Sequence, residues 1–182
     1  MTKMLAISIG GILTLFPFAV GLLPFLDPLK KKKKRGPTGV TPSMDADGFI
    51  RVTSVDTLTA PNLPTFFKVR ADHIDAWNYF AEIPVGSIYL YRTGDIGKDG
   101  TKAIVAFSTT CPHAGCAVDF KRGTKSFDCP CHNSSFTIQG KRSDASPSPR
   151  DLDRLETKIE QNAIWVKFQK FRAGISEKAV IA

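Results

Sequence analysis

The stretch Cys111-Pro-His-Ala-Gly-Cys116, followed 12 residues later by Cys129-Pro-Cys-His-Asn-Ser134, decides the fold. These two segments hold all four cysteines and two of the three histidines of the 182-residue chain. Each follows a run of β-type residues and contains proline or glycine, so each is predicted to be a loop at a strand end. Two facing loops that each offer Cys and His side chains can close around a metal centre.

Three interpretations account for this cluster of side chains. A tetrahedral zinc site would take one Cys and one His from each loop but would leave two cysteines without a role. Two structural disulfides would use every cysteine but would leave both histidines unexplained. A [2Fe–2S] cluster with two thiolates on one iron and two imidazoles on the other gives both loops and both residue types a task. The pattern favours the third interpretation.

The two loops resemble the cluster-binding boxes of Rieske iron–sulfur proteins. The additional cysteine pair makes them similar to the high-potential, disulfide-bearing branch found in quinol:cytochrome c reductases of the cytochrome bc type. The resemblance covers residues 104–152 best and implies a Rieske [2Fe–2S] cofactor. Its implied ligands are Cys111, His113, Cys129 and His132.

The same resemblance implies further roles in these loops and beyond them. Cys116 and Cys131 are expected to form a disulfide, and the proline-rich run with Pro147 and Pro149 is expected to cover the cluster. His132 would accept a hydrogen bond and a proton from quinol bound to a cytochrome b subunit. The electron would then pass to a c-type cytochrome.

The chain also departs from the common Rieske pattern. Pro112 and Ala114 stand where Thr and Leu are usual, Asn133 replaces Gly, and Phe136 replaces a Tyr that donates to a cysteine ligand, while Ser134 is kept. A lost hydrogen-bond donor near sulfur lowers the potential of such a cluster, and alanine in place of leucine shields the cluster less. We therefore expect a lowered potential that suits a low-potential quinol such as menaquinol.

From Phe49 onward the chain alternates short β-type runs with turn signals. This pattern predicts a mainly β fold, and the resemblance implies a Rieske-type antiparallel base with an inserted cluster-binding subdomain at about 109–150. Short helices are expected at Ala71–Phe80 and Asp151–Leu155. Strands are expected at Phe49–Val52, Phe66–Val69, Ser87–Arg92, Ile104–Ser108, Ala117–Phe120, Ser126–Cys129 and Ile164–Phe168.

The N-terminal region is predicted to anchor the protein in a membrane. Met4–Leu26 is a run of 23 residues without a charge, long enough as a helix to cross a hydrocarbon core of about 30 Å. The alternative is a secretory signal peptide, but the run is long and no clear cleavage site follows. We expect one transmembrane helix within residues 1–29.

Residues 30–48 are predicted to be a basic flexible linker that joins the anchor to a Rieske domain at 49–182. Lys30–Arg35 supplies six of the formal charges in a net charge of +8, so the remaining chain is nearly neutral and nucleic-acid binding is not expected. The block would contact lipid headgroups or act as a solvated flank. It argues for a cytoplasmic head, whereas a disulfide argues for the periplasmic, oxidising side, which we favour.

The sequence thus predicts an electron-transfer subunit of a membrane quinol:cytochrome c oxidoreductase. The alternative is a Rieske ferredoxin-like carrier or the Rieske component of a non-quinol oxidoreductase. The anchor, the additional cysteine pair and the proline-rich loop favour the quinol complex. No P-loop or dinucleotide fingerprint is present, so the chemistry rests on the cofactor.

Overall fold

The computed structural model describes residues 17, 20–22, 44–75, 78–96 and 102–181. The chain forms two compact units, Met1–Val40 and Thr41–Ala182. In the first unit the described residues are helical. No helix among the described residues has the length and apolar content needed to span a membrane. The expected anchor at 1–29 and most of the expected linker at 30–48 lie outside the described residues.

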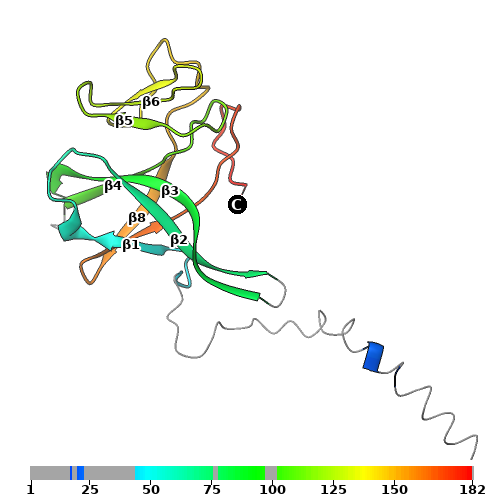
Figure 1. Cartoon of the computed structure of the whole chain (residues 1–182). Helices are drawn as coiled ribbons and strands as arrows, with labels where there is room; N and C mark the ends of the chain where they lie inside the picture. The colour runs from blue at the N-terminus through cyan, green and yellow to red at the C-terminus, as the bar shows by residue number, and fades with distance from the viewer. Residues whose placement is uncertain (1–16, 18–19, 23–43, 76–77, 97–101, 182) are drawn as a thin grey trace, which may run out of the picture. The chain divides into compact units, whose positions relative to one another are not determined.

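The second unit is built on an antiparallel sheet of six strands, in the order β1-β9-β8-β4-β3-β2 (Figure 1). The edge strands β1 and β2 lie close to each other, so the sheet curves towards a barrel. The mainly β fold predicted from the sequence is confirmed. The strands are β1 (Ile50–Ser54), β2 (Thr65–Asp75), β3 (Asn78–Ile96), β4 (Lys102–Ser108), β8 (Arg154–Glu160) and β9 (Ala163–Lys167), with a 3-10 turn η2 (Val55–Thr57) after β1.

A second, smaller sheet is inserted between β4 and β8. It consists of β5 (Asp119–Lys121), β6 (Ser126–Asp128) and β7 (Ser135–Thr137), paired antiparallel in chain order. Figure 1 shows it beyond the β3–β4 end of the larger sheet. This sheet and its loops form the inserted subdomain that the sequence predicts.

Both expected helices are wrong. Within Ala71–Phe80 the described residues are extended, because Ala71 pairs with Ile83 and His73 with Phe80 between β2 and β3. Leu155 lies in β8, where its backbone pairs with Ala106 of β4 and its side chain is buried. In both places pairing with another strand overrides the local preference for helix.

Two hydrophobic clusters stabilise this unit. One consists mainly of aliphatic side chains from the larger sheet, such as Ile88, Leu90 and Ile164, which are all fully buried. The other joins the two sheets and includes Cys111, Cys129 and a set of aromatic side chains. Of the tryptophans, Trp165 is half-buried and Trp77 lies outside the described residues. The second cluster contains Tyr89, Tyr91, Val105, Phe107, Val118, Phe127, Phe136 and Leu152 in addition to the two cysteines.

Two tyrosines of β3 fix the smaller sheet on the larger one. The hydroxyl of Tyr89 accepts a hydrogen bond from the Phe120 backbone N–H at 3.1 Å and donates to the Val118 carbonyl at 3.4 Å. The hydroxyl of Tyr91 donates to the Ile138 carbonyl at 2.9 Å. Because each ring is buried and each hydroxyl is bonded, β3 sets the position of the loops that carry the cysteines.

Candidate metal centre

The two loops have the same backbone design. In the first, the Cys111 N–H donates to the Cys116 carbonyl at 2.7 Å; in the second, the Cys129 N–H donates to the Ser134 carbonyl at 2.8 Å. The fifth residue of each six-residue loop has a left-handed backbone, Gly115 with φ +80° and Asn133 with φ +57°. Both loops are therefore closed turns that fix the directions of their Cys and His side chains.

Each loop contributes one buried cysteine without a disulfide partner. Cys111 is 0% exposed and Cys129 is 3% exposed. Burial raises the pKa of the Cys111 thiol and the adjacent Cys129 thiol raises it further, while the Ser134 hydroxyl and the His113 backbone N–H oppose the rise. Two adjacent thiols in an apolar setting become stable thiolates when a metal cation supplies the compensating charge.

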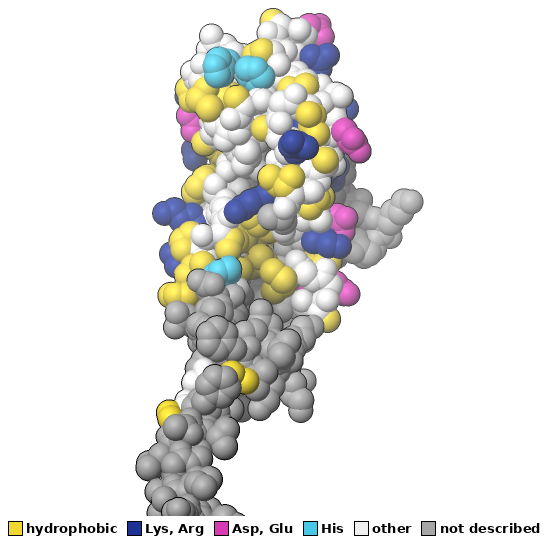
Figure 2. Space-filling model, turned by 90° about the vertical axis from the view of Figure 1, so that its right-hand side faces the viewer, with side chains coloured by type: hydrophobic (Ala, Val, Ile, Leu, Met, Phe, Trp, Pro, Cys, Tyr) yellow, Lys and Arg dark blue, Asp and Glu magenta, His cyan; other side chains and the backbone are white. Residues whose placement is uncertain are grey.

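Each loop also contributes one histidine, and the two rings lie together. The centroids of His113 and His132 are 5.0 Å apart and the rings are nearly perpendicular, at 85°. Nδ1 of His113 is buried and has no hydrogen-bond partner among the described residues, whereas His132 is exposed. Figure 2 shows two histidine side chains side by side at one end of the head, with hydrophobic side chains next to them.

The disulfide expected between Cys116 and Cys131 is present and joins the two loops covalently. Its sulfur atoms and the sulfur of Cys129 all lie within 4.8 Å of one another. Since Cys116 and Cys131 are oxidised, Cys129 is the member of this sulfur group that can act as a thiolate ligand.

Ser134 is kept from the Rieske pattern and is fully buried. Its hydroxyl forms no hydrogen bond in the described part of the chain, yet it is close enough to Cys111 to lower the pKa of that thiol. Phe136, on β7, is 1% exposed and packs in the same hydrophobic cluster as Cys111 and Cys129. Ala114 is exposed beside His113, so its methyl group shields little of the loop surface.

The proline-rich run lies against the second loop. Pro147 is exposed and Pro149 is half-buried, whereas the serine beside each proline points inward. Ser146 is 6% exposed, and its hydroxyl accepts a hydrogen bond from the Ser135 N–H at 3.3 Å. This contact ties the run to the residue that follows the second loop.

One segment that supports the loops gave no signal in the sequence. The N–H of Gly174, near the C-terminus, donates to the Pro112 carbonyl at 2.8 Å, between Cys111 and His113. A glycine 62 positions from its partner in the chain has no local pattern to mark it. Only the folded chain brings the C-terminal segment to the first loop.

The donor set fits a [2Fe–2S] cluster of mixed ligation. Two buried free thiols lie together, two imidazoles lie together, and one imidazole turns an unpartnered nitrogen inward. Two thiolates for one iron and two imidazoles for the other match the Rieske ligand requirement.

Residues 78–157 match the family model of the Rieske [2Fe–2S] domain. The chain therefore carries a Rieske domain, an electron-transfer domain with a [2Fe–2S] cofactor.

Several similar proteins are named as iron–sulfur subunits. The chain is 31% identical over 120 residues to the menaquinol:cytochrome c reductase iron–sulfur subunit of Geobacillus thermodenitrificans, covering 64% of this chain and 65% of that protein. It is 28% identical over 130 residues to the subunit of the same name in Bacillus subtilis (strain 168), covering 70% and 71%. A cytochrome b6-f complex iron–sulfur subunit of Prochlorococcus marinus (strain MIT 9301) is 38% identical over 76 residues, 42% of this chain and 39% of that one.

Among solved structures, the cyanobacterial plasma membrane Rieske protein PetC3 from Synechocystis PCC 6803 matches with a TM-score of 0.44 and 28% identity. The match covers 65% of this chain and 99% of that one.

Proposed function

We propose that this chain is the electron-transfer subunit of a membrane quinol:cytochrome c oxidoreductase. The observation that carries the proposal is the pair of matched loops, each with a buried free cysteine and a histidine, joined by a disulfide. Relatives named as menaquinol:cytochrome c reductase subunits support it. The isolated chain is an electron carrier; the oxidoreductase activity belongs to the assembled complex.

The proposed ligands are Cys111 and Cys129 for one iron and His113 and His132 for the other. When bound, the cluster supplies one-electron chemistry at a potential that its two neutral imidazole ligands raise. The unpartnered Nδ1 of His113 is the ligand atom on that ring. Ser134 stabilises the reduced state because its hydroxyl can donate to sulfur.

His132 is the proposed contact with quinol. Its ring belongs to the exposed residue of the histidine pair, so its outer nitrogen is open to a quinol hydroxyl. That nitrogen accepts the hydrogen bond and then holds the proton as the electron leaves quinol. Phe136 stands where the Rieske pattern has a hydrogen-bond donor to sulfur, and Ala114 stands where it has a larger apolar side chain. Both replacements support menaquinol over ubiquinol as the electron donor.

The proposed partners are a cytochrome b-type subunit that holds the quinol and a c-type cytochrome that accepts the electron. Residues 1–29 anchor the chain in the bilayer as a single span, and residues 30–48 are the tether that lets the Rieske domain at 49–182 move between partners. The disulfide supports a head on the periplasmic, oxidising side, despite the lysine block that favours the opposite orientation.

Low-temperature EPR of the full chain tests this proposal. A rhombic signal of the mixed-ligand type after ascorbate alone is the expected result and indicates a high-potential cluster. The same signal only after dithionite favours a ferredoxin-like carrier or a strongly lowered menaquinol-type centre. Zinc, or no metal, in place of the signal contradicts the cluster assignment.

Histidine variants separate the proposed ligands from a bystander. His132→Gln is expected to abolish the rhombic signal because it removes one imidazole ligand. His73→Gln is the matched control, since His73 is an exposed residue of β2 outside both loops. Loss of the signal in both variants, or in neither, contradicts the ligand assignment.

A further inference from the structure

The C-terminal segment forms a small hairpin rooted in the larger sheet. The Arg172 N–H donates to the Ala179 carbonyl and the Ile181 N–H to the Lys170 carbonyl, both at 2.9 Å. Phe171 at its base is 8% exposed and belongs to the aliphatic cluster of the larger sheet. Figure 1 shows this C-terminal segment, in red, running from the larger sheet towards the loops of the smaller one.

The turn of this hairpin holds the first loop. The 2.8 Å bond from Gly174 to the carbonyl of Pro112 fixes the peptide that joins the two proposed ligands of that loop. Gly174 has φ +79°, a conformation that costs other residues about 1 kcal/mol or more. The glycine thus lets the chain turn its N–H towards a buried carbonyl.

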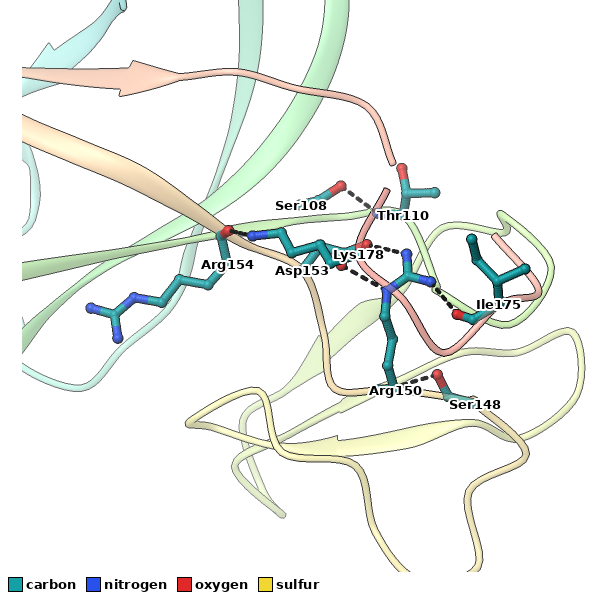
Figure 3. A network of polar contacts seen from close by, with 8 residues as sticks. All are labelled: Ser108, Thr110, Ser148, Arg150, Asp153, Arg154, Ile175 and Lys178. Carbon is teal, nitrogen blue, oxygen red and sulfur yellow. Dashed lines mark hydrogen bonds and ion pairs between the residues drawn. The ribbon is translucent and has the colours of Figure 1, made fainter. Parts of the chain in front are cut away.

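Arg150 connects the same hairpin to the proline-rich run (Figure 3). Its Nε and Nη2 donate to the two carboxylate oxygens of Asp153 at 3.0 and 2.8 Å, and its Nη1 donates to the Ile175 carbonyl at 2.6 Å. The side chains of Arg150 and Asp153 are only 9% and 4% exposed. A buried two-pronged pair of this kind holds the guanidinium in one orientation, so its third contact is fixed as well.

The proline-rich run completes the connection to the second loop. The Ser148 hydroxyl donates to the Arg150 carbonyl at 2.7 Å. The Ser146 hydroxyl accepts from the Ser148 N–H at 3.4 Å and from the Ser135 N–H at 3.3 Å. Ser135 directly follows Ser134, the last residue of the second loop.

We propose that these contacts form a second clasp that holds the two cluster loops together, alongside the disulfide. The polar clasp consists of Ser146, Ser148, Arg150, Asp153 and the hairpin turn at Gly174 and Ile175. Arg150 and Gly174 are positioning residues, because they act on the cluster through Pro112 and the proline-rich run. The inference rests on the ligand set proposed above.

Two parallel clasps make a specific energetic prediction. If either clasp alone holds the loops, removing one clasp weakens cluster retention only slightly. Removing both then weakens it by more than the sum of the two separate effects. If the hairpin merely stabilises the larger sheet, the two losses add.

The experiment uses the full chain loaded with its cluster. Three versions of the chain are compared: wild type, Arg150→Lys, and a chain truncated after Arg172. Arg150→Lys keeps a cation opposite Asp153 but cannot reach both Asp153 and Ile175, whereas the truncation removes Gly174 and Ile175 and retains Phe171. Each is made with the disulfide intact and with Cys116→Ser and Cys131→Ser.

The rate of iron release to a chelator is followed by the visible circular dichroism of the cluster, at a temperature where the far-ultraviolet spectrum shows the head folded. Each clasp variant is expected to release iron about tenfold faster than its parent in the disulfide-free background, the factor that one or two hydrogen bonds carry. The acceleration with the disulfide intact is expected to be clearly smaller. Lys141→Met is the control, since it removes only an exposed ion pair with Asp151.

Equal acceleration in both backgrounds, or none in either, overturns the second clasp. If the truncated chain does not fold, the Arg150→Lys series decides by the same criterion. A wild-type chain that shows no rhombic EPR signal contradicts the proposed function instead, so the two failures are distinguishable.

Discussion

At the scale of single residues, Asn133 shows why the loops tolerate some departures from the Rieske pattern. The fifth position of this loop needs a left-handed backbone, and asparagine adopts it at lower cost than other non-glycine residues. We expect Asn133→Gly to preserve the free energy of unfolding, whereas Asn133→Ala should lower it by about 1 kcal/mol. Urea unfolding of the two variants measures this difference, and equal stabilities would contradict the strain argument.

Phe136 is expected to influence the midpoint potential of the cluster. It is buried in the cluster that includes both free cysteines, and a hydroxyl on this ring would add a donor near sulfur. We expect Phe136→Tyr to raise the midpoint potential by about 60 mV, which corresponds to a tenfold preference for the reduced state in a one-electron couple. Redox titration followed by EPR measures the shift.

Phe120→Tyr is the matched control for this substitution. Phe120 lies in β5 of the same subdomain and is half-buried, so a hydroxyl there changes the polarity of the subdomain at a ring that is not a buried member of the cluster around the two free cysteines. A midpoint unchanged in Phe136→Tyr, or raised equally in both variants, contradicts the account of the lowered potential.

The site could be predicted to the extent that its residues are close in sequence. Cys111, His113, Cys129 and His132 fall in two short segments, and ligand chemistry restricts what such a set can bind. Arg150 lies 25 residues from Ile175, and the carbonyl it binds belongs to no recognisable motif. Contacts between a side chain and a distant backbone carbonyl leave no pattern in one sequence.

At the scale of secondary-structure elements, the turn after β7 packs closely against the larger sheet at Gly140. A Cβ on Gly140 would lie 2.5 Å from Cε1 of the Phe107 ring, and φ at this glycine is +79°. Phe107 belongs to β4 and is 2% exposed, so its ring has little room to move. We expect Gly140→Ala to lower the free energy of unfolding by about 2 kcal/mol or more, measured by urea unfolding.

Gly123→Ala provides the comparison for this turn. Gly123 lies in the β5–β6 turn, where an added Cβ would meet nothing within 4 Å, and its φ is not positive. The expected change is within about 0.5 kcal/mol. If both alanine variants are equally stable, the close approach at Phe107 does not constrain the fold.

The strands show what local pattern can and cannot reveal. Runs such as Ile104–Ser108 are recognisable because β-branched and aromatic residues fill a buried sheet. Ala71–Phe80 is predicted as a helix although its own residues pair with one another, Ile74 with Tyr79 and Asp75 with Asn78, because a local run of residue types does not show which residues pair across strands. β7 has three residues, too few to show an alternation.

At the scale of the whole molecule, the head is held at its N-terminal end by an ion pair. Asp45 lies 2.5 Å from the ammonium of Lys158 in β8, and its carboxylate also accepts the Phe49 N–H at 2.8 Å. The ammonium of Lys158 lies 4.9 Å from the centroid of the Phe49 ring. These contacts fix the turn that contains Asp45 against β8.

The ion pair makes stability depend on pH with a definite sign. The Lys158 ammonium lowers the pKa of Asp45 below its ordinary value of 3.8, burial opposes this, and backbone N–H groups lower it further. A folded-state pKa below the unfolded one gives a contribution that is fully present above about pH 4 and is lost as the pH falls through the depressed pKa. We expect Asp45→Asn to reduce the melting temperature at pH 7.

The same variant should match wild type once the pH lies below the folded-state pKa of Asp45, because the wild-type carboxylate is then neutral too. Thermal unfolding between pH 2 and 7 follows the convergence. Asp47→Asn is the control, since Asp47 lies in the same turn but forms no ion pair within the described ranges; its melting curve should follow wild type throughout. A difference between Asp45→Asn and wild type that persists at low pH would show that the carboxylate shape, through its bonds to backbone N–H groups, stabilises the turn rather than its charge.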